Sequence, residues 1–181
     1  MVTVLKMIAF YLILAKGIDD MVTAYFQTPV GVARIVEEDN FITSISVLDG
    51  QFDLTPAKSP LLKLAIEQLD EYFAGGRKIF DLPLKQTGSE FQQKVWDELL
   101  KIDYGTTISY LQQSKLMESP LGIRAIAAAN ARNSLWIVVP CHRVIGSNGS
   151  LTGYAGGLWR KQWLLNHEAK VMGIGQTRLD F

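Results

Sequence analysis

The sequence predicts an α+β fold in two parts, a small antiparallel sheet with one helix followed by a mostly helical half. Three short apolar segments near the start of the chain are separated by turn-forming residues, which is typical of strands. The second half carries apolar residues at helical spacing, including two short helices joined by a tight turn. A chain of 181 residues with 48% hydrophobic content can bury a core of this size.

The first part predicts a sheet and one helix. The expected strands cover residues 22–26, 31–36 and 41–47. A helix follows, because Ser59-Pro60 is a good start, apolar residues then recur at helical spacing, and Gly75-Gly76 ends the pattern. Residues 80–84 form a last strand or a linker, so we place the domain boundary near residue 85.

The second part predicts four helices. Thr87-Gly88-Ser89-Glu90 has the form of a capping box, which starts a helix with one apolar face. That face consists of Phe91, Val95, Trp96, Leu99 and Leu100. Helices over 110–117 and 121–131 around a short turn match a helix-turn-helix. The last expected helix covers 158–168.

Cys141 is the only cysteine of the chain and is followed by His142. A thiolate is a strong nucleophile, and an adjacent histidine can supply the base that forms it. The apolar run 135–139 predicts a buried strand that Pro140 ends, which places Cys141 at the end of a strand. Small-residue loops follow over 146–150 and 152–157 and leave room for a ligand. We therefore interpret Cys141 as reactive, the alternative being an inert buried cysteine.

Composition limits the function classes. One cysteine forms no intramolecular disulfide and no Cys-rich zinc site, and His142 and His167 are the only histidines. We therefore expect no metal, no cofactor and a cytoplasmic protein. Residues 1–84 carry a net charge of −4 and residues 85–181 a net charge of +4, which suits the second half to a polyanion.

The first twenty residues require a separate interpretation. Residues 7–15 are apolar, too short to cross a bilayer but long enough for the core of a signal peptide. The charged segment that follows, Lys16-Gly17-Ile18-Asp19-Asp20, is a poor small-x-small cleavage site, and Met21-Val22-Thr23 repeats Met1-Val2-Thr3. We interpret residues 1–20 as a peripheral extension or a start-site artefact, with a signal peptide as the alternative. The expected division is then 21–84 for the first domain, 85–170 for the second and 171–181 for a tail.

Cys141 lies in the motif Pro140-Cys141-His142-Arg143-Val144. An Asn stands eight residues before the Cys, Tyr154-Ala155-Gly156-Gly157 lies just after it, and His167-Glu168 follows further on. Together these residues resemble the O6-alkylguanine-DNA alkyltransferase family. These methylated-DNA-protein-cysteine methyltransferases move an alkyl group from guanine onto their own cysteine. The resemblance covers residues 91–168. It implies a ribonuclease H-like first domain, a winged-helix-like second domain and one turnover per chain.

The resemblance also implies a role for each matching residue. Cys141 is the alkyl acceptor, His142 takes its proton through a water, and Glu168 orients the histidine. Asn133 ties the helix-turn-helix to the cysteine loop, and Tyr110 assists nucleotide rotation and donates to the purine. The substrate and DNA contacts it implies are the Arg124 finger, Ala125, Ala127 and Ala128 in the minor groove, the carbonyls of Cys141 and Val144 for the guanine amine, and a loop over the flipped base formed by Tyr154, Ala155, Gly156 and Gly157.

The expected partner is therefore double-stranded DNA containing O6-alkylguanine, bound by a monomer away from membranes, with O4-alkylthymine as a second substrate. Ala155 stands where many family members have serine, and Trp136 is bulkier than expected and lies in a pocket wall or in the core. Zinc-ligand cysteines are missing, so the resemblance is to the stand-alone, constitutive bacterial type. Two alternatives are a non-catalytic protein that binds alkylated DNA, against which Cys141 argues, and a Cys-His-Glu hydrolase, which leaves the helix-turn-helix unexplained.

Overall fold

The computed structural model describes residues 21–118 and 122–174 and has an α+β fold. The first part is an antiparallel sheet in the order β1 (Val22–Thr28), β2 (Gly31–Glu38) and β3 (Phe41–Leu48). The register between β2 and β3 shifts at Val36/Glu37. All three expected strands are confirmed. Residues 1–20, for which an extension was expected, lie outside the described residues.

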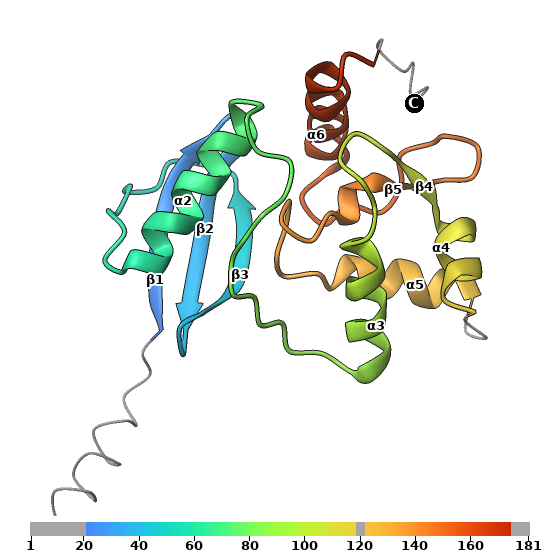
Figure 1. The fold of residues 1–181 in the computed structure, drawn as a ribbon, viewed down its shortest axis with the longest axis horizontal. Coiled ribbons are helices and arrows are strands. Elements are labelled where there is room, and N and C mark those ends of the chain that lie inside the picture. The colour runs from blue at the N-terminus through green and yellow to red at the C-terminus, as the bar shows by residue number, and fades with distance from the viewer. Residues whose placement is uncertain (1–20, 119–121, 175–181) are drawn as a thin grey trace, which may run out of the picture.

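The helix α2 (Pro60–Phe73) covers one face of this sheet (Figure 1). The hydroxyl of Ser59 accepts a hydrogen bond from the Leu62 amide, and Pro60 occupies the first turn, where its missing N–H costs nothing. The helix ends where Gly75 adopts a φ of 82°, a conformation that glycine reaches without strain. The start and end predicted from Ser59-Pro60 and Gly75-Gly76 are therefore confirmed.

The segment after α2 behaves as a linker with one bridge. Leu84 forms an isolated parallel bridge to Ile42, and the Ile42 amide donates to the Pro83 carbonyl at 2.8 Å. The chain then enters α3 (Glu90–Leu99), whose capping box joins Ser89 to Gln92 rather than Thr87 to Glu90 as expected. Leu100, expected on the apolar face, is exposed because α3 has ended by then.

The helix-turn-helix is formed by α4 (Tyr110–Leu116) and α5 (Gly122–Ala131), close to the expected bounds. Buried Asn130 donates to the side chain of Gln113 at 2.9 Å, and Trp96 donates to the Ala129 carbonyl at 3.0 Å, so that α3, α4 and α5 are joined by internal hydrogen bonds. The last helix, α6 (Leu158–Val171), is one turn longer than expected. Among the described residues, no helix is long and apolar enough to cross a membrane.

Two short parallel strands, β4 (Ile108–Ser109) and β5 (Val144–Ile145), bring the start of α4 beside the segment that follows the cysteine. Between the parts of the molecule, residues 135–139 do not form the strand that was expected. Leu135 alone bridges to Ile45, after which the Val138 and Val139 amides bond back to residues 136 and 135 in consecutive turns. Apart from half-buried Trp136 the apolar run is buried, and it turns at Ile137, which adopts a φ of 72°.

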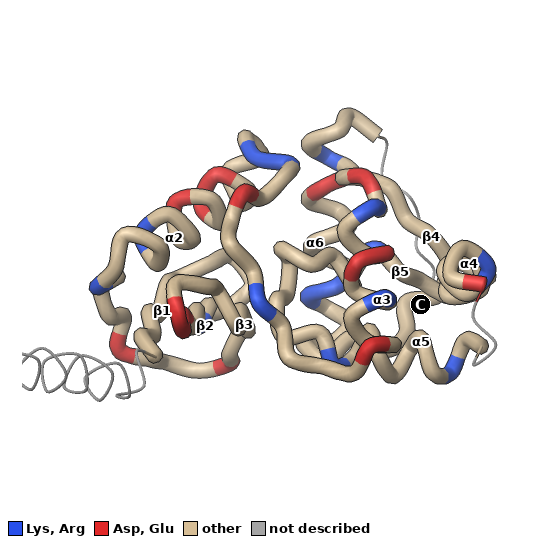
Figure 2. The backbone as a smooth tube through the Cα atoms, turned by 60° about the horizontal axis from the view of Figure 1, so that its bottom comes forward, with Lys and Arg blue, Asp and Glu red and all other residues tan. Residues whose placement is uncertain are grey.

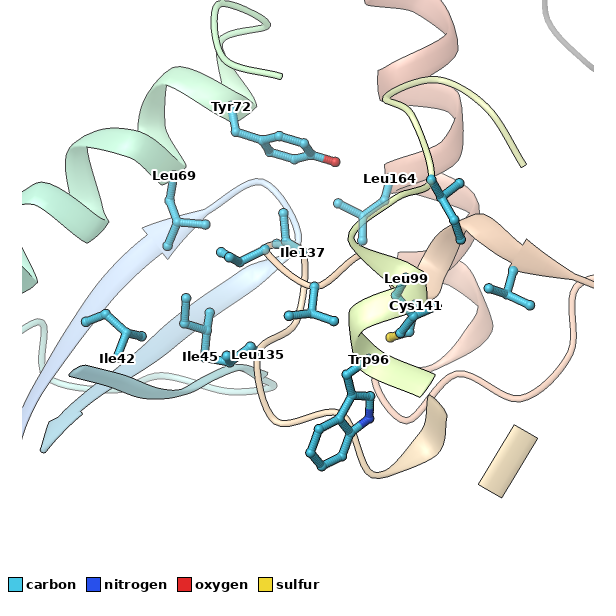
Figure 3. Close-up of a cluster of buried hydrophobic side chains, with 14 of the residues drawn as sticks. Ile42, Ile45, Leu69, Tyr72, Trp96, Leu99, Leu135, Ile137, Cys141 and Leu164 are labelled. Carbon is cyan, nitrogen blue, oxygen red and sulfur yellow. The ribbon is translucent and has the colours of Figure 1, made fainter. Parts of the chain in front are cut away.

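One apolar core joins both parts of the fold. Figure 3 shows Ile42, Ile45 and Leu69 from the sheet and α2 on one side, and Leu99, Cys141 and Leu164 on the other. Leu135 and Ile137 lie between them in the same cluster. The turn-forming segment that carries the core across the junction therefore leads directly into the short helix η1 (Cys141–Arg143).

Candidate active site

Cys141 lies at the start of η1 with 7% of its surface exposed. Its Sγ accepts a hydrogen bond of 3.2 Å from Asn133 Nδ2. Burial raises the pKa of the thiol, and the Asn133 hydrogen bond and the charge of Lys161 offset this only in part. At neutral pH the resting group is therefore a protonated thiol, which needs a base before it can act as a nucleophile.

Asn133 connects the end of the helix-turn-helix to the cysteine. The same Nδ2 that reaches Sγ donates to the Val139 carbonyl at 2.7 Å, while Oδ1 accepts from the Leu135 amide at 2.9 Å and from Gln86 at 2.9 Å. Because the side chain is buried, breaking these bonds would leave polar groups without partners. The structure thus places Asn133 between the end of the helix-turn-helix and the cysteine loop, the position that the sequence analysis expects for it.

His142 follows the cysteine and is fully buried. Its Nε2 lies 2.9 Å from Glu168 Oε1, whereas its buried Nδ1 has no hydrogen-bond partner among the described residues. Burial lowers the pKa of His142, although the Glu168 carboxylate opposes the shift. A neutral imidazole that donates from Nε2 to Glu168 has its lone pair on Nδ1, so Nδ1 is the atom able to take a proton.

Glu168 is the centre of a buried hydrogen-bond network. Beside His142, its carboxylate accepts from Tyr72 Oη at 2.8 Å, from the Gly105 amide at 2.9 Å, and from Arg143 Nε and Nη2 at 3.0 and 2.9 Å. Burial alone would raise the pKa of this carboxyl, but the hydrogen bonds of His142 and Arg143 and the guanidinium charge hold it well below its usual range. The carboxylate is therefore ionised and fixed in place.

Two members of this network were not predicted. Arg143 donates hydrogen bonds from Nε and Nη2 to the Glu168 carboxylate. It donates a third hydrogen bond, from Nη1, to the Ile102 carbonyl at 2.7 Å. Tyr72 reaches the same carboxylate from α2. The position of Arg143 directly after Cys-His was the available signal, whereas nothing in the local sequence marks Tyr72, because its role depends on the packing of α2 against the second half.

The loop 152–157 lies beside these groups and is held by aromatic side chains. Tyr110 Oη donates to the carbonyls of Thr152 and Gly153 at 3.3 and 3.4 Å. The ring of Tyr154 lies 5.6 Å from that of Trp136, and a Cβ added at Gly156 would lie 2.5 Å from the Trp136 ring. Half-buried Trp136 therefore packs both against this loop and against the apolar core cluster.

Lys161 is another buried cation that the sequence analysis missed. Its Nζ donates to the Val144 carbonyl at 2.6 Å and to the Thr152 carbonyl at 2.8 Å, and it lies 5.7 Å from the centroid of the Tyr110 ring. Burial lowers the pKa of this lysine to about 8. A signal did exist, because Lys161 shares its helical face with buried Leu164 and Glu168 at spacings of three and seven.

Arg124 lies on the exposed side of α5, away from the network around Cys141. Ala128 is exposed on the same helix, and Ala125 and Ala127 are half-buried, while Ile126 faces the core. A helix whose outer surface carries one arginine and small side chains can approach a narrow groove closely. Figure 2 shows acidic positions along α2 and α3, whereas α5 carries none.

Comparisons with known proteins agree with this geometry. Residues 21–86 match the family model of the ribonuclease-like domain of 6-O-methylguanine DNA methyltransferase, and residues 90–170 match the model of its DNA binding domain. The constitutive methylated-DNA–protein-cysteine methyltransferase of Bacillus subtilis is 45% identical over 78% of this chain and 92% of its own. The corresponding methyltransferase of Methanosarcina acetivorans is 39% identical over 82% of this chain and 98% of its own.

Solved structures show the same likeness. The crystal structure of Mycobacterium tuberculosis O6-methylguanine methyltransferase has a TM-score of 0.74 and 37% identity over 83% of this chain and 93% of its own. The structure of Mycobacterium tuberculosis OGT in complex with DNA has a TM-score of 0.73 and 36% identity over 82% of this chain and 93% of its own.

Proposed function

This chain belongs to the 6-O-methylguanine DNA methyltransferase family, and from that premise we propose that Cys141 is the residue that accepts the alkyl group from O6 of guanine. The protein is a methylated-DNA–protein-cysteine methyltransferase that repairs DNA by direct alkyl transfer. The observation that carries the assignment is the sole cysteine of the chain, held by Asn133 and adjacent to the buried His142–Glu168 pair.

The thiol must lose its proton to react. His142 Nδ1 takes this proton through a bridging water, and Glu168 stabilises the imidazolium that forms, which is triad logic with one water inserted. Ionised Glu168 is suited to this role because Arg143 and Tyr72 keep its oxygens in place. The nearby Lys161 charge favours the thiolate, since it lowers the pKa that burial raises.

The transfer is a displacement at the alkyl carbon. The Cys141 sulfur forms a bond to this carbon, and the bond from carbon to O6 breaks with its electron pair passing to the guanine. Tyr110 Oη transfers a proton to the purine as it leaves, and the Ala155 amide donates a hydrogen bond to it, because expelling a bare purine anion is unfavourable; the proton that His142 took from the thiol then restores the phenol. The carbonyls of Cys141 and Val144 accept from the guanine exocyclic amine. The thioether product has no route to hydrolysis, so each chain acts once.

The target carbon lies inside a duplex, so the nucleotide must be extruded, which costs roughly a few kcal/mol. The α5 surface enters the minor groove with Ala125, Ala127 and Ala128, and Arg124 occupies the space that the base leaves. The loop residues Tyr154 to Gly157 then cover the base. DNA is the partner of this family. We assign to this chain O6-alkylguanine as the main lesion and O4-alkylthymine as a second one. We further propose that the protein acts as a monomer in the cytoplasm and that its domain boundary lies near residue 85.

The experiment is a turnover count. An excess of duplex carrying labelled O6-methylguanine is incubated with the protein, and transferred methyl groups are counted per chain. We expect transfer to stop at one group per chain, and Cys141→Ala to transfer none while it still binds the duplex. Sustained transfer beyond one group would contradict the proposal and favour a hydrolytic Cys-His-Glu enzyme.

A further inference from the structure

The side chain of Arg160, the third residue of α6, joins segments from both parts of the fold. It is buried, with 5% of the side chain exposed. Nε donates to the Val30 carbonyl, in the turn between β1 and β2, at 2.7 Å. Nη1 donates to the Gly156 carbonyl at 2.7 Å, and Nη2 pairs with the Asp49 carboxylate just after β3 at 2.5 Å. One guanidinium thus bonds to the sheet and to the loop 152–157.

The surroundings fix this guanidinium in one position. The ring of Trp159 lies 4.5 Å from the guanidinium carbon. On the sheet side, a Cβ added at Gly31 would lie 3.1 Å from Nη2, and the φ of 122° at this position itself favours glycine. A planar fork that is held on several sides loses little freedom when it forms its hydrogen bonds, so the contact is directional and not a loose attraction of charges.

The neighbouring cation, Lys161, holds the other end of the same loop. It donates to the carbonyl of Thr152, where the loop begins, whereas Arg160 donates to that of Gly156, near its end. Both ends of the loop are therefore fixed to α6 by buried cations. The difference between them is that Arg160 also bonds to Val30 and Asp49, so the position of the sheet bears on this end of the loop.

We propose that Arg160 is a positioning residue through which the N-terminal sheet holds the loop 152–157 closed over Cys141. Asp49 is the part of this connection that can be removed with least damage, because its side chain is 83% exposed and lies in the N-terminal part. The inference rests on the proposed role of the loop as a cover for the substrate base. It predicts that an exposed carboxylate after β3 influences a reaction at a cysteine on the other part of the molecule.

Two readouts separate positioning from simple stabilisation. The first is single-turnover reaction with free O6-benzylguanine at increasing concentration, which gives a half-saturation concentration and a limiting rate without any contribution from DNA binding. The second is alkylation by iodoacetamide, which reports on Cys141 alone because the chain has no other cysteine. The variants are Asp49→Ala, Arg160→Met and the double variant, with Asp53→Ala as the matched control from the same exposed loop.

Asp49→Ala should raise the half-saturation concentration by about 3- to 10-fold and speed iodoacetamide alkylation, because a misplaced cover binds the base less well and exposes the thiol. Its limiting rate and thermal midpoint should match those of Asp53→Ala. Adding Asp49→Ala to Arg160→Met should change nothing further, since both act through one contact. If Asp49→Ala equals Asp53→Ala in both readouts, the inference is overturned, even where Arg160→Met does not fold. A wild-type protein that transfers no alkyl group overturns the proposed function instead.

Discussion

Tyr72 and Glu168, 96 positions apart in the chain, are joined by a hydrogen bond of 2.8 Å between the phenol and the carboxylate. Figure 3 shows the Tyr72 hydroxyl pointing from α2 towards the second part of the fold. The accepting oxygen, Oε1, is also the one that faces His142 Nε2. The N-terminal part therefore contributes a direct contact to the network behind the cysteine.

Removing that contact tests how much of the network depends on it. Tyr72→Phe should lower the free energy of unfolding by about 1 to 3 kcal/mol, because a buried carboxylate loses one donor. The alkyl-transfer rate should fall less than about threefold, since Arg143 and the Gly105 amide still fix Glu168. Urea denaturation and single-turnover kinetics measure the two quantities. A large loss of rate at unchanged stability would contradict this account of Tyr72.

The pH dependence of stability follows from the lowered pKa of Glu168. A carboxyl whose pKa is lower in the folded than in the unfolded protein contributes stability above its unfolded value, here 4.5, and this contribution is lost as the pH falls towards the folded value. Glu168→Gln leaves the charge of buried Arg143 without an opposite charge. This substitution should lower the free energy of unfolding by about 3 to 5 kcal/mol at pH 7. The difference in free energy of unfolding between the wild type and Glu168→Gln should become smaller below pH 4.5. A difference that stays constant down to pH 3 would show that Glu168 is not ionised in the fold.

A substitution at Arg124 tests the DNA-binding surface separately from the alkyl transfer. Arg124→Ala should slow repair of an O6-methylguanine duplex by about 10-fold or more, because an inserted side chain offsets part of the unstacking cost. The reaction with free O6-benzylguanine should be unchanged, since Arg124 is exposed on α5 and bonds to no group of the cysteine network. Lys115→Ala, also in the helix-turn-helix, serves as a control for the loss of one charge. Equal losses on duplex and free base would refute a role in base extrusion.

Gly156 and Trp136 test how the covering loop is packed. Gly156→Ala should lower the free energy of unfolding by about 1 to 3 kcal/mol and slow the reaction with free O6-benzylguanine. The reason is that the new methyl group would overlap the Trp136 ring. Trp136→Ala creates the missing space, so the double variant should recover part of the rate that Gly156→Ala loses. Thermal denaturation and reaction with O6-benzylguanine measure both effects. A double variant slower than either single variant would show that Trp136 does not support the loop.

Local signals predicted most of the fold. The strands and α2 follow from alternation, the Ser59 cap and the Gly75 stop, all of which act within a few residues. The run at 135–139 was interpreted wrongly because a short buried apolar segment has the same composition whether it forms a strand or consecutive turns. Its turns are selected by tertiary contacts, namely the bridge of Leu135 to Ile45 and the hydrogen bonds of Asn133.

The site was predicted unevenly for a similar reason. Cys141 and His142 are adjacent in sequence, so their chemistry could be inferred directly, and Glu168 entered through the family resemblance. Arg143, Arg160 and Lys161 were missed because a charged residue is ordinarily expected at the surface. Each is buried here by partners from other segments, such as Glu168 for Arg143 and Asp49 for Arg160. Such pairings depend on the folded arrangement, so the local signals at Arg143 and Lys161 did not identify their partners.

The central claim, that Cys141 itself carries away the alkyl group, is tested most directly by peptide mass analysis. The protein is incubated with an equimolar O6-methylguanine duplex and digested, and the mass of each peptide is compared with that from untreated protein. We expect one added methyl group, located on Cys141, together with an equal amount of restored guanine. A methyl group on any other residue, or restored guanine with an unmodified Cys141, would contradict it.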